Sequence, residues 1–374
     1  MPIVRRHTLL VKTERGLFMS NSLNGRKVAV IGCGFVGSTT AYSLMQSKLF
    51  TDMVLIDVDT NRAEGEALDI SHGIPYYSPM NIYAGTYEDL SDASIVIITA
   101  GANQKPGETR LDLVQKNVAI FKTIVPRIME QGFDGIFLVV SNPVDILTQV
   151  VMELSGLPRE RVMGSGTVLD SARLKYTLGH MLDVDPRHVH ARIIGEHGDS
   201  ELAVWSAANV SGIGINDFFR LRGIENATEI RASVEESVRN SAYEIIEKKR
   251  ATYFGIAPSV TRICEAIVRD QKSIMTVSNY RTDVQGVPDV VMSLPAIVGS
   301  KGVEFPIPLQ LSIDEAELLH SSAQTLKNTL NQIDFSLQAE SHMQNNARTC
   351  GLKCLLFLYV QETECSSSCG CGHC

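Results

Sequence analysis

The stretch VAVIGCGFVG, Val28–Gly37, joins a short apolar run to three glycines at the spacing Gly-x-Gly-x-x-Gly. The run predicts a buried strand, and the glycines predict a tight turn into a helix. The first glycine permits the turn, the second lets a pyrophosphate approach the backbone, and the third lets the helix pack against the strand. The unpaired N–H groups and the positive dipole end of that helix favour an anion. The candidate cofactor-binding residues of this turn are Gly32, Gly34, Phe35, Val36 and Gly37.

An acidic residue narrows the choice of ligand. Asp57 ends the next apolar run, twenty positions after Gly37. A carboxylate there can accept hydrogen bonds from both hydroxyls of an adenosine ribose, and it would repel a 2′-phosphate. The glycines alone would also suit an ordinary turn, but the strand, the helix and the acid together predict binding of NAD rather than NADP.

Apolar, β-branched runs alternate with helical patterns through the first half of the chain, which predicts a parallel, doubly wound α/β sheet. The runs are apolar throughout, as expected for strands covered on both faces. Loops that begin at Gly32, Ala100 and Ser141 should therefore meet at the carboxyl edge of the sheet, where ligands bind in such folds. The predicted strands are 27–31, 53–56, 94–99 and 136–140, and the predicted helices are 37–47, 62–71 and 111–131.

The second half of the chain predicts an antiparallel α+β domain. Its helical patterns cover 170–181, 227–249 and 314–330, and its apparent strands cover 274–278 and 290–294. We therefore expect an NAD-binding Rossmann domain over residues 23–165 and a substrate domain over residues 166–335.

Both ends of the chain lie outside this domain pair. Residues 1–22 carry basic side chains without the apolar core of a secretory signal, which predicts a disordered extension; a transit peptide or a true start at Met19 are the alternatives. Six of the eight cysteines lie in residues 336–374. The segment Cys369–Cys374 has the residue types of a zinc site. The abrupt change of composition instead favours an unstructured or artefactual extension, and we expect no metal site.

Composition limits the partners and the compartment. The formal net charge is −8, so no basic field favours nucleic acid or an anionic membrane surface. No apolar run approaches the roughly 20 residues needed to cross a bilayer. Only Cys33 and Cys264 lie in the body of the chain, and so few cysteines suit a reducing cytosol. We expect a cytoplasmic protein without nucleic-acid or membrane partners.

A histidine between glycines is the strongest candidate for proton transfer. His197 lies in Gly195–Asp199, where small neighbours leave room for a substrate against the imidazole. Hydride transfer to a carbonyl creates an alkoxide that must be protonated, and histidine exchanges protons near neutral pH. A lone histidine more often has a structural role, so the assignment depends on its partners.

Asp170, Arg173 and Arg110 supply candidate partners. Asp170 and Arg173 share one helical face, where the simplest interpretation is a local ion pair. Alternatively, Asp170 orients His197 while Arg173 binds a substrate carboxylate through its planar fork. The polar stretch Asn103–Arg110 is either a surface loop or a lid that brings Arg110 over a substrate carbonyl.

These motifs together resemble the L-lactate dehydrogenases of the lactate/malate dehydrogenase superfamily, most closely the bacterial, cytosolic type. The resemblance runs from about Leu23 to Phe335 and covers nearly the whole family domain pair. It implies reversible reduction of pyruvate to L-lactate with NADH. The motifs that carry it are 32–37, 103–110, 141–145, 169–173 and 195–199.

The resemblance assigns a role to each matching residue. His197 is the implied proton donor and acceptor, and Asp170 is its orienting partner. Arg173 anchors the substrate carboxylate, and Arg110 polarises the substrate carbonyl. Asn142 hydrogen-bonds the substrate and helps to position the nicotinamide.

Three further positions bear on the substrate. Thr252 resembles the threonine that lines the substrate pocket, and Arg250 departs from the family by replacing a usual glycine. Gln104 is neutral where malate dehydrogenases carry an arginine, which implies a preference for pyruvate over oxaloacetate. The alternatives are a malate dehydrogenase and a catalytically inactive NAD-binding structural protein.

The resemblance also implies regulation and assembly. Many bacterial relatives are activated by fructose 1,6-bisphosphate between subunits, and Lys175 and His190 occupy the corresponding positions. Both could instead be ordinary surface residues. The family is typically tetrameric, so a homotetramer is expected.

Overall fold

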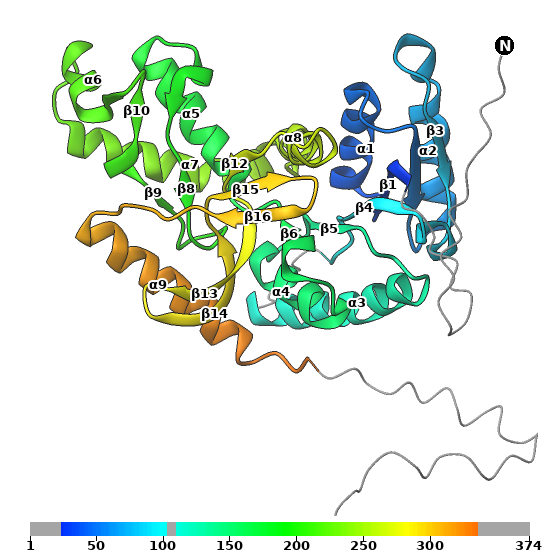
Figure 1. The fold of residues 1–374 in the computed structure, drawn as a ribbon. Helices are drawn as coiled ribbons and strands as arrows, with labels where there is room; N and C mark the ends of the chain where they lie inside the picture. Colours follow the sequence, from blue (N-terminus) through cyan, green and yellow to red (C-terminus); the bar gives the residue numbers. More distant parts are fainter. Residues whose placement is uncertain (1–23, 103–109, 336–374) are drawn as a thin grey trace, which may run out of the picture. The chain divides into compact units, whose positions relative to one another are not determined.

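The computed structural model describes residues 24–102 and 110–335, which belong to one compact unit (Figure 1). The expectations for residues 1–22 and 336–374, and for Gln104, lie outside these described residues, as does the side chain of Arg110. No helix within the described ranges is long and apolar enough to cross a membrane.

A parallel sheet forms the first part of the fold and confirms the doubly wound α/β prediction. Its strands are ordered β3-β2-β1-β4-β5-β6, so the chain reverses direction across the sheet between β1 and β4. All four predicted strands are present. The bounds are β1 Asn24–Ile31, β2 Asp52–Ile56, β3 Asn81–Ala84, β4 Ala93–Ile98, β5 Ile136–Val139 and β6 Val162–Gly164.

Helices cover both faces of this sheet, which explains why its strands are apolar throughout. Val28 and Val30 of β1 pack with α1 (Phe35–Ser47), α2 (Thr60–Ser71) and α8 (Ile256–Val268). The alternate residues Ala29 and Ile31 pack on the opposite face, where the helices are α3 (Arg110–Glu130), α4 (Val144–Ser155) and α9 (Ile313–Leu330) (Figure 1).

The second part of the chain completes the same sheet. The antiparallel hairpin of β13 (Ser278–Val284) and β14 (Val287–Ser293) joins β6 through Ser278 and Gly164, which gives eight strands in all. The predicted strand 274–278 is therefore two strands, because β12 (Ser273–Met275) instead pairs with β15 (Ala296–Gly299). The remaining partner of β15 is β16 (Gly302–Pro306).

A third apolar cluster packs three helices of the second part of the chain against one another. It joins the buried faces of α5 (Val168–Leu182), α6 (Ile215–Leu221) and α7 (Ala227–Lys249). Because α5 is packed along its length, its first turn is a fixed platform beside the carboxyl edge of the sheet. The short strands here are β7 Val189–His190, β8 Ile193–Ile194, β9 Leu202–Ala203, β10 Asn209–Val210 and β11 Ile213–Gly214. Five 3-10 helices complete the description, at Ile74–Tyr76, Tyr87–Leu90, Arg159–Arg161, Pro186–His188 and Trp205–Ala207.

Candidate active site

The turn after β1 is held in a shape that only glycine adopts easily at its first position. Gly32 has φ +99°, and its N–H donates to the carbonyl oxygen of Ile56 at 2.7 Å. A methyl group on Gly32 would lie 2.5 Å from the backbone nitrogen of Ala100. The turn is thus wedged between the ends of β2 and β4.

The carboxyl ends of three parallel strands meet at this turn. Thr99 donates through its hydroxyl to the carbonyl oxygen of Gly32 at 2.7 Å, and Ser141 donates likewise to Ala100 at 2.7 Å. The side-chain amide of Asn117 donates to the carbonyl oxygen of Asn142 at 2.8 Å. These contacts bring together the loops that begin at Gly32, Ala100 and Ser141.

The geometry of the turn fits a dinucleotide. A Cβ built on Gly34 meets no atom within 4 Å, so the backbone there is open to a close approach. Asp57 lies beside it and already accepts from the N–H groups of Cys33 at 2.6 Å and Asp59 at 2.9 Å. A carboxylate and a row of backbone donors are the groups that the ribose and the pyrophosphate require.

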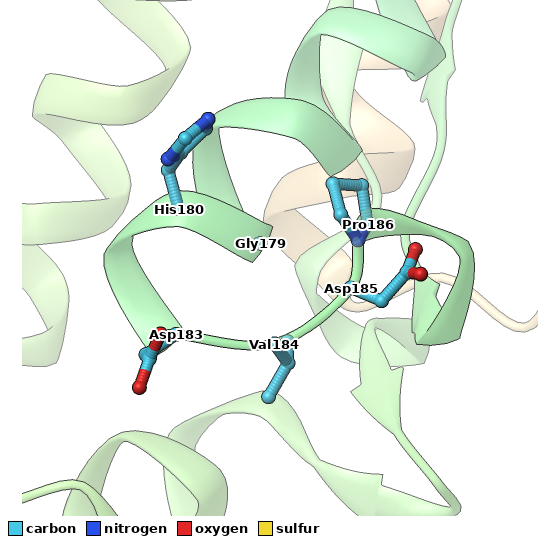
Figure 2. A pocket seen from close by; sticks show the side chains of 6 residues that line it. All are labelled: Gly179, His180, Asp183, Val184, Asp185 and Pro186. Carbon is cyan, nitrogen blue, oxygen red and sulfur yellow. The ribbon is translucent and has the colours of Figure 1, made fainter.

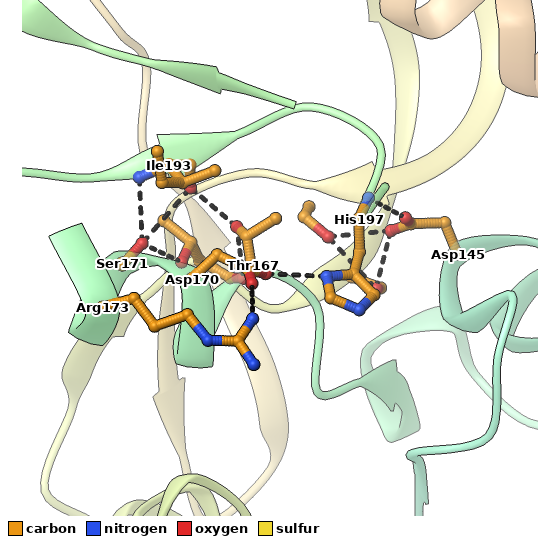
Figure 3. A network of polar contacts seen from close by, with 10 residues as sticks. Asp145, Thr167, Asp170, Ser171, Arg173, Ile193 and His197 are labelled. Carbon is orange, nitrogen blue, oxygen red and sulfur yellow. Dashed lines mark hydrogen bonds and ion pairs between the residues drawn. The ribbon is translucent and has the colours of Figure 1, made fainter. Parts of the chain in front are cut away.

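A charged pair forms the centre of the substrate side (Figure 3). Nδ1 of His197 lies 2.7 Å from Oδ2 of Asp170, and a guanidinium nitrogen of Arg173 donates to Oδ1 of the same carboxylate at 2.7 Å. The Asp170 side chain is 2% exposed, whereas those of Arg173 and His197 are 15% and 25% exposed. The buried carboxylate therefore holds two partly open side chains side by side.

This arrangement keeps His197 protonated at neutral pH. Burial lowers the pKa of His197, but the charge and hydrogen bond of Asp170, with smaller contributions from Glu201 and Asp145, raise it to about 9. Burial acts to raise the pKa of Asp170, but His197 and Arg173 lower it overall. The pair is accordingly an imidazolium beside a carboxylate, ready to donate a proton.

Asp145 is a functional candidate that the sequence analysis missed. It is 2% exposed, and its carboxylate accepts from the backbone N–H of His197 at 2.8 Å. The hydroxyls of Ser278 and Ser293 also donate to it, at 2.7 Å and 2.8 Å. No local pattern indicates this role, because an acid in the first turn of a helix is common and the two serines lie 133 and 148 residues away in the chain.

A second set of hydrogen bonds fixes the start of α5. Thr167 donates through its hydroxyl to the carbonyl oxygen of Ile193 at 2.6 Å, and the N–H of Ile193 donates to the hydroxyl of Ser171 at 3.0 Å (Figure 3). These bonds tie the first turn of α5 to β8, which ends three residues before His197 in the chain. The spacing between Asp170 and His197 is therefore set by the backbone.

The other predicted residues lie at separate positions in the fold. Thr252 is half-buried between α7 and α8, and Asn142 is exposed at the end of its loop. Arg110 begins α3. Lys175 lies further along α5 and His190 lies in β7.

One cavity lies at the opposite end of α5 from Asp170 (Figure 2). It measures about 280 Å³ and is bounded by the last turn of the helix and the following residues, between Gly179 and Pro186. Its walls carry none of the residues predicted for catalysis or cofactor binding.

Comparisons with known proteins agree over the whole described body. The lactate/malate dehydrogenase NAD binding domain matches residues 26–164, and the lactate/malate dehydrogenase alpha/beta C-terminal domain matches residues 167–335. An L-lactate dehydrogenase of Thermoanaerobacterium saccharolyticum is 52% identical over 309 residues, which span 83% of this chain and 99% of that protein. An L-lactate dehydrogenase of Clostridium botulinum is 49% identical over 313 residues, 84% and 98% of the two chains. The crystal structure of the minor L-lactate dehydrogenase of Enterococcus mundtii in its ligand-bound form has a TM-score of 0.80 and 44% identity, covering 83% of this chain and 99% of that one.

Proposed function

Because the chain belongs to the lactate/malate dehydrogenase family, we propose that it is an L-lactate dehydrogenase that interconverts pyruvate and L-lactate with NAD. The observation that carries this proposal is the ion pair of His197 with Asp170, next to Arg173. The bound cofactor supplies the hydride for reduction. All other steps belong to side chains of this protein.

The proton step follows from the tautomer that Asp170 imposes. Because Nδ1 of His197 faces Asp170 at 2.7 Å, Nε2 is the nitrogen that can exchange a proton with the substrate oxygen. In reduction the imidazolium donates this proton as the alkoxide develops. In lactate oxidation the neutral imidazole accepts it.

Substrate orientation is assigned to two arginines and an asparagine. Arg173 uses one guanidinium nitrogen for Asp170, which leaves other N–H groups of its fork for the substrate carboxylate. Arg110 is assigned to stabilise negative charge on the carbonyl oxygen. Asn142 hydrogen-bonds the substrate beside the nicotinamide, and Thr252 borders the same pocket.

A side-by-side assay tests the substrate. The protein should reduce pyruvate with NADH far faster than oxaloacetate, because a second carboxylate would meet no counter-charge at Gln104. Gln104→Arg should reverse the preference. Equal turnover of both substrates by the unchanged protein would contradict the assignment, and no turnover of either would favour an inactive NAD-binding protein.

Two variants separate proton transfer from substrate binding. His197→Ala should bind NADH nearly normally and lose at least about 10²–10⁴ in turnover. Arg173→Lys should chiefly weaken pyruvate binding, since a point charge cannot replace the planar fork. Near-normal turnover in the first variant, or unchanged pyruvate affinity in the second, would remove that residue from its role.

Assembly and regulation form the second level of the proposal. We place the enzyme in the cytoplasm as a homotetramer in glycolysis and pyruvate fermentation, with residues 23–165 binding NAD and 166–335 binding substrate. Lys175 and His190 would bind fructose 1,6-bisphosphate between subunits. In support, burial and the nearby charge of Arg192 lower the pKa of Lys175. A bound anion would reduce the repulsion between these two cations. Neither Lys175 nor Arg192 has an acidic partner within the part of the chain that the structure describes.

A further inference from the structure

A second cavity lies next to the loop that carries His197. It measures about 240 Å³ and lies between the loop that carries His197 and the helices α7 and α9. Glu201 borders it from the loop, Glu235 and Arg239 from α7, and Ser322 from α9. The hydroxyl of Ser322 accepts from the N–H of Glu196 at 2.9 Å. This hydrogen bond joins α9, which forms part of the cavity wall, to the loop that carries His197.

Glu201 connects this cavity to the catalytic pair. It is 6% exposed. One of its carboxylate oxygens, a ring nitrogen of His197 and a carboxylate oxygen of Asp170 all lie within 4.8 Å of one another. On the cavity side, Arg239 donates to the carbonyl oxygen of Glu201 at 3.3 Å, and its buried Nε has no hydrogen-bond partner within the described residues.

The charges that face Glu201 come from three elements. Asp170 and Arg173 face it from α5, His197 from its own loop, and Arg239 from α7. Burial and repulsion by Asp170 raise the pKa of Glu201 to about 8, against the opposing effects of the three cations. Asp145 on α4 is the further acid that acts on His197. Glu201 thus changes charge in the same pH range as the imidazole it faces.

We infer that Glu201 is a positioning residue that sets the protonation of the His197–Asp170 pair, and with it the pH at which the enzyme changes from binding pyruvate to binding lactate. This inference rests on the proposed function. Ionised Glu201 stabilises the imidazolium, which pyruvate reduction needs. Loss of that charge favours the neutral imidazole, which lactate oxidation needs. Glu201 does not touch the substrate, so its effect passes through His197.

Glu201→Gln tests the inference because it removes the charge and keeps the shape. The pH at which kcat/KM for pyruvate falls should move down by about one unit, since an opposite charge at this distance shifts a pKa by about that much. At pH values above the midpoints of both proteins, kcat/KM for pyruvate should be about tenfold lower in the variant than in the wild type. The change should appear as a higher KM, with kcat unchanged. The KM for lactate at about pH 8 to 9, where Glu201 of the wild type is ionised, should fall. A lower KM for lactate together with a higher KM for pyruvate is a change that general structural damage would not produce.

Matched variants control for the surroundings. Glu235→Gln removes an acid from the same cavity and should leave both profiles unchanged, because Glu235 does not act on His197. Glu201→Asp keeps the charge and should restore most of the wild-type profile. Glu201→Ser is a second neutral variant for the case in which glutamine disturbs folding, since the adjoining cavity can admit water in place of the lost side chain.

Titration of the His197 ring by carbon-13 NMR gives a readout independent of turnover. Its midpoint should be lower by about one unit in Glu201→Gln than in the wild type. An unchanged midpoint would overturn the inference, and so would an equal shift in Glu235→Gln. If the protein turned over neither pyruvate nor lactate, the proposed function would fail while this titration would still decide whether Glu201 controls His197.

Discussion

At the scale of single residues, the charge of His197 decides whether the enzyme is ready to reduce pyruvate or to oxidise lactate. Its stabilising acid, Asp170, is almost fully buried yet stays ionised, because Arg173 and His197 both bind it. Removing one of these partners would leave the buried carboxylate of Asp170 partly uncompensated, which would destabilise the folded protein. Arg173 is therefore needed for the electrostatics of the site as well as for anchoring the substrate.

The raised pKa of His197 predicts how activity responds to pH. With a pKa of about 9 in place of the usual 6.5, the imidazolium persists through neutral pH. The KM for pyruvate should stay flat to about pH 8 and rise about tenfold per unit above pH 9, whereas the KM for lactate should fall until about pH 9. Initial rates in both directions from pH 6 to 10 measure this. Asp170→Asn should move both changes to lower pH, and a wild-type midpoint near 6.5 would contradict the prediction.

Local sequence could reveal some of these residues and not others. His197 between glycines, and the i,i+3 spacing of Asp170 and Arg173, were visible because their signals lie within a few positions. The importance of Asp145 depends on hydroxyls of Ser278 and Ser293, which are 133 and 148 residues away. Such partners meet only when the hairpin β13–β14 joins the sheet, so no local pattern could identify them.

At the scale of secondary structure, two glycines of the dinucleotide turn should respond differently to the same substitution. A methyl group on Gly37 would lie 1.8 Å from the carbonyl oxygen of Gly32, whereas one on Gly34 meets nothing within 4 Å. Gly37→Ala should push α1 away from β1 and reduce stability by about 1–3 kcal/mol, together with NADH binding. Gly34→Ala should keep its melting temperature and lose NADH affinity alone, because the methyl group occupies the approach of the pyrophosphate.

Thermal melting and NADH fluorescence titration on both variants separate the two effects. Ala41→Gly, within α1 but away from the turn, is a control for general weakening of the helix. If Gly34→Ala bound NADH normally, the pyrophosphate would not approach this turn closely. A fully stable Gly37→Ala variant would contradict the packing role.

The end of α7 carries a strained residue that can be relieved. Arg250 caps the helix with φ +74° and ψ −18°, a left-handed conformation that side chains with a Cβ rarely adopt. Arg250→Gly should therefore stabilise the protein by about 0.5–1 kcal/mol, seen as a rise of about 1–3 °C in melting temperature at fixed protein concentration. Arg250→Ala keeps the Cβ and should give no gain. An equal rise in both variants would show that the charge, and not the backbone, is the source of strain.

The elements themselves were predictable to different degrees. Apolar runs marked the strands of the parallel sheet because both faces are buried, and those predictions are confirmed. The single strand predicted at 274–278 is wrong, since the chain leaves the sheet at Thr276 and Val277. There the carbonyl oxygen of Thr276 accepts from the N–H of Thr167, and that of Val277 accepts from Leu294. Because these carbonyl groups bond to residues far away in the chain, the sequence of 274–278 does not indicate that the strand is interrupted.

At the scale of the whole molecule, exposed apolar side chains support the proposed assembly. Val58, Leu68 and Tyr76 lie on or next to α2, and each is at least 62% exposed. Exposed apolar side chains are common on surfaces that contact another chain. A second copy covering this region would bury them, in keeping with the proposed tetramer. Light scattering that shows only monomers with full activity would contradict this.

Activation by a sugar bisphosphate is the prediction that joins assembly to catalysis. Two cations that face each other, Lys175 and Arg192, disfavour any arrangement that brings further positive charge close. An anion that binds between subunits would neutralise them and stabilise the assembled state by mass action. Fructose 1,6-bisphosphate should therefore lower the KM for pyruvate near pH 6. The same comparison is made near pH 8.

The measurement is pyruvate saturation with and without the bisphosphate at both pH values, alongside light scattering at the same protein concentration. Lys175→Gln should abolish the activation and leave unactivated turnover in place, while Lys175→Arg should strengthen it, because the guanidinium binds phosphate through two parallel hydrogen bonds. His190→Gln should weaken the activation, because it removes the second residue proposed to bind the bisphosphate. Superimposable curves with and without the bisphosphate at both pH values, in a protein that binds pyruvate normally, would eliminate the site, because ligand binding that favours the active assembly must change the apparent affinity for pyruvate.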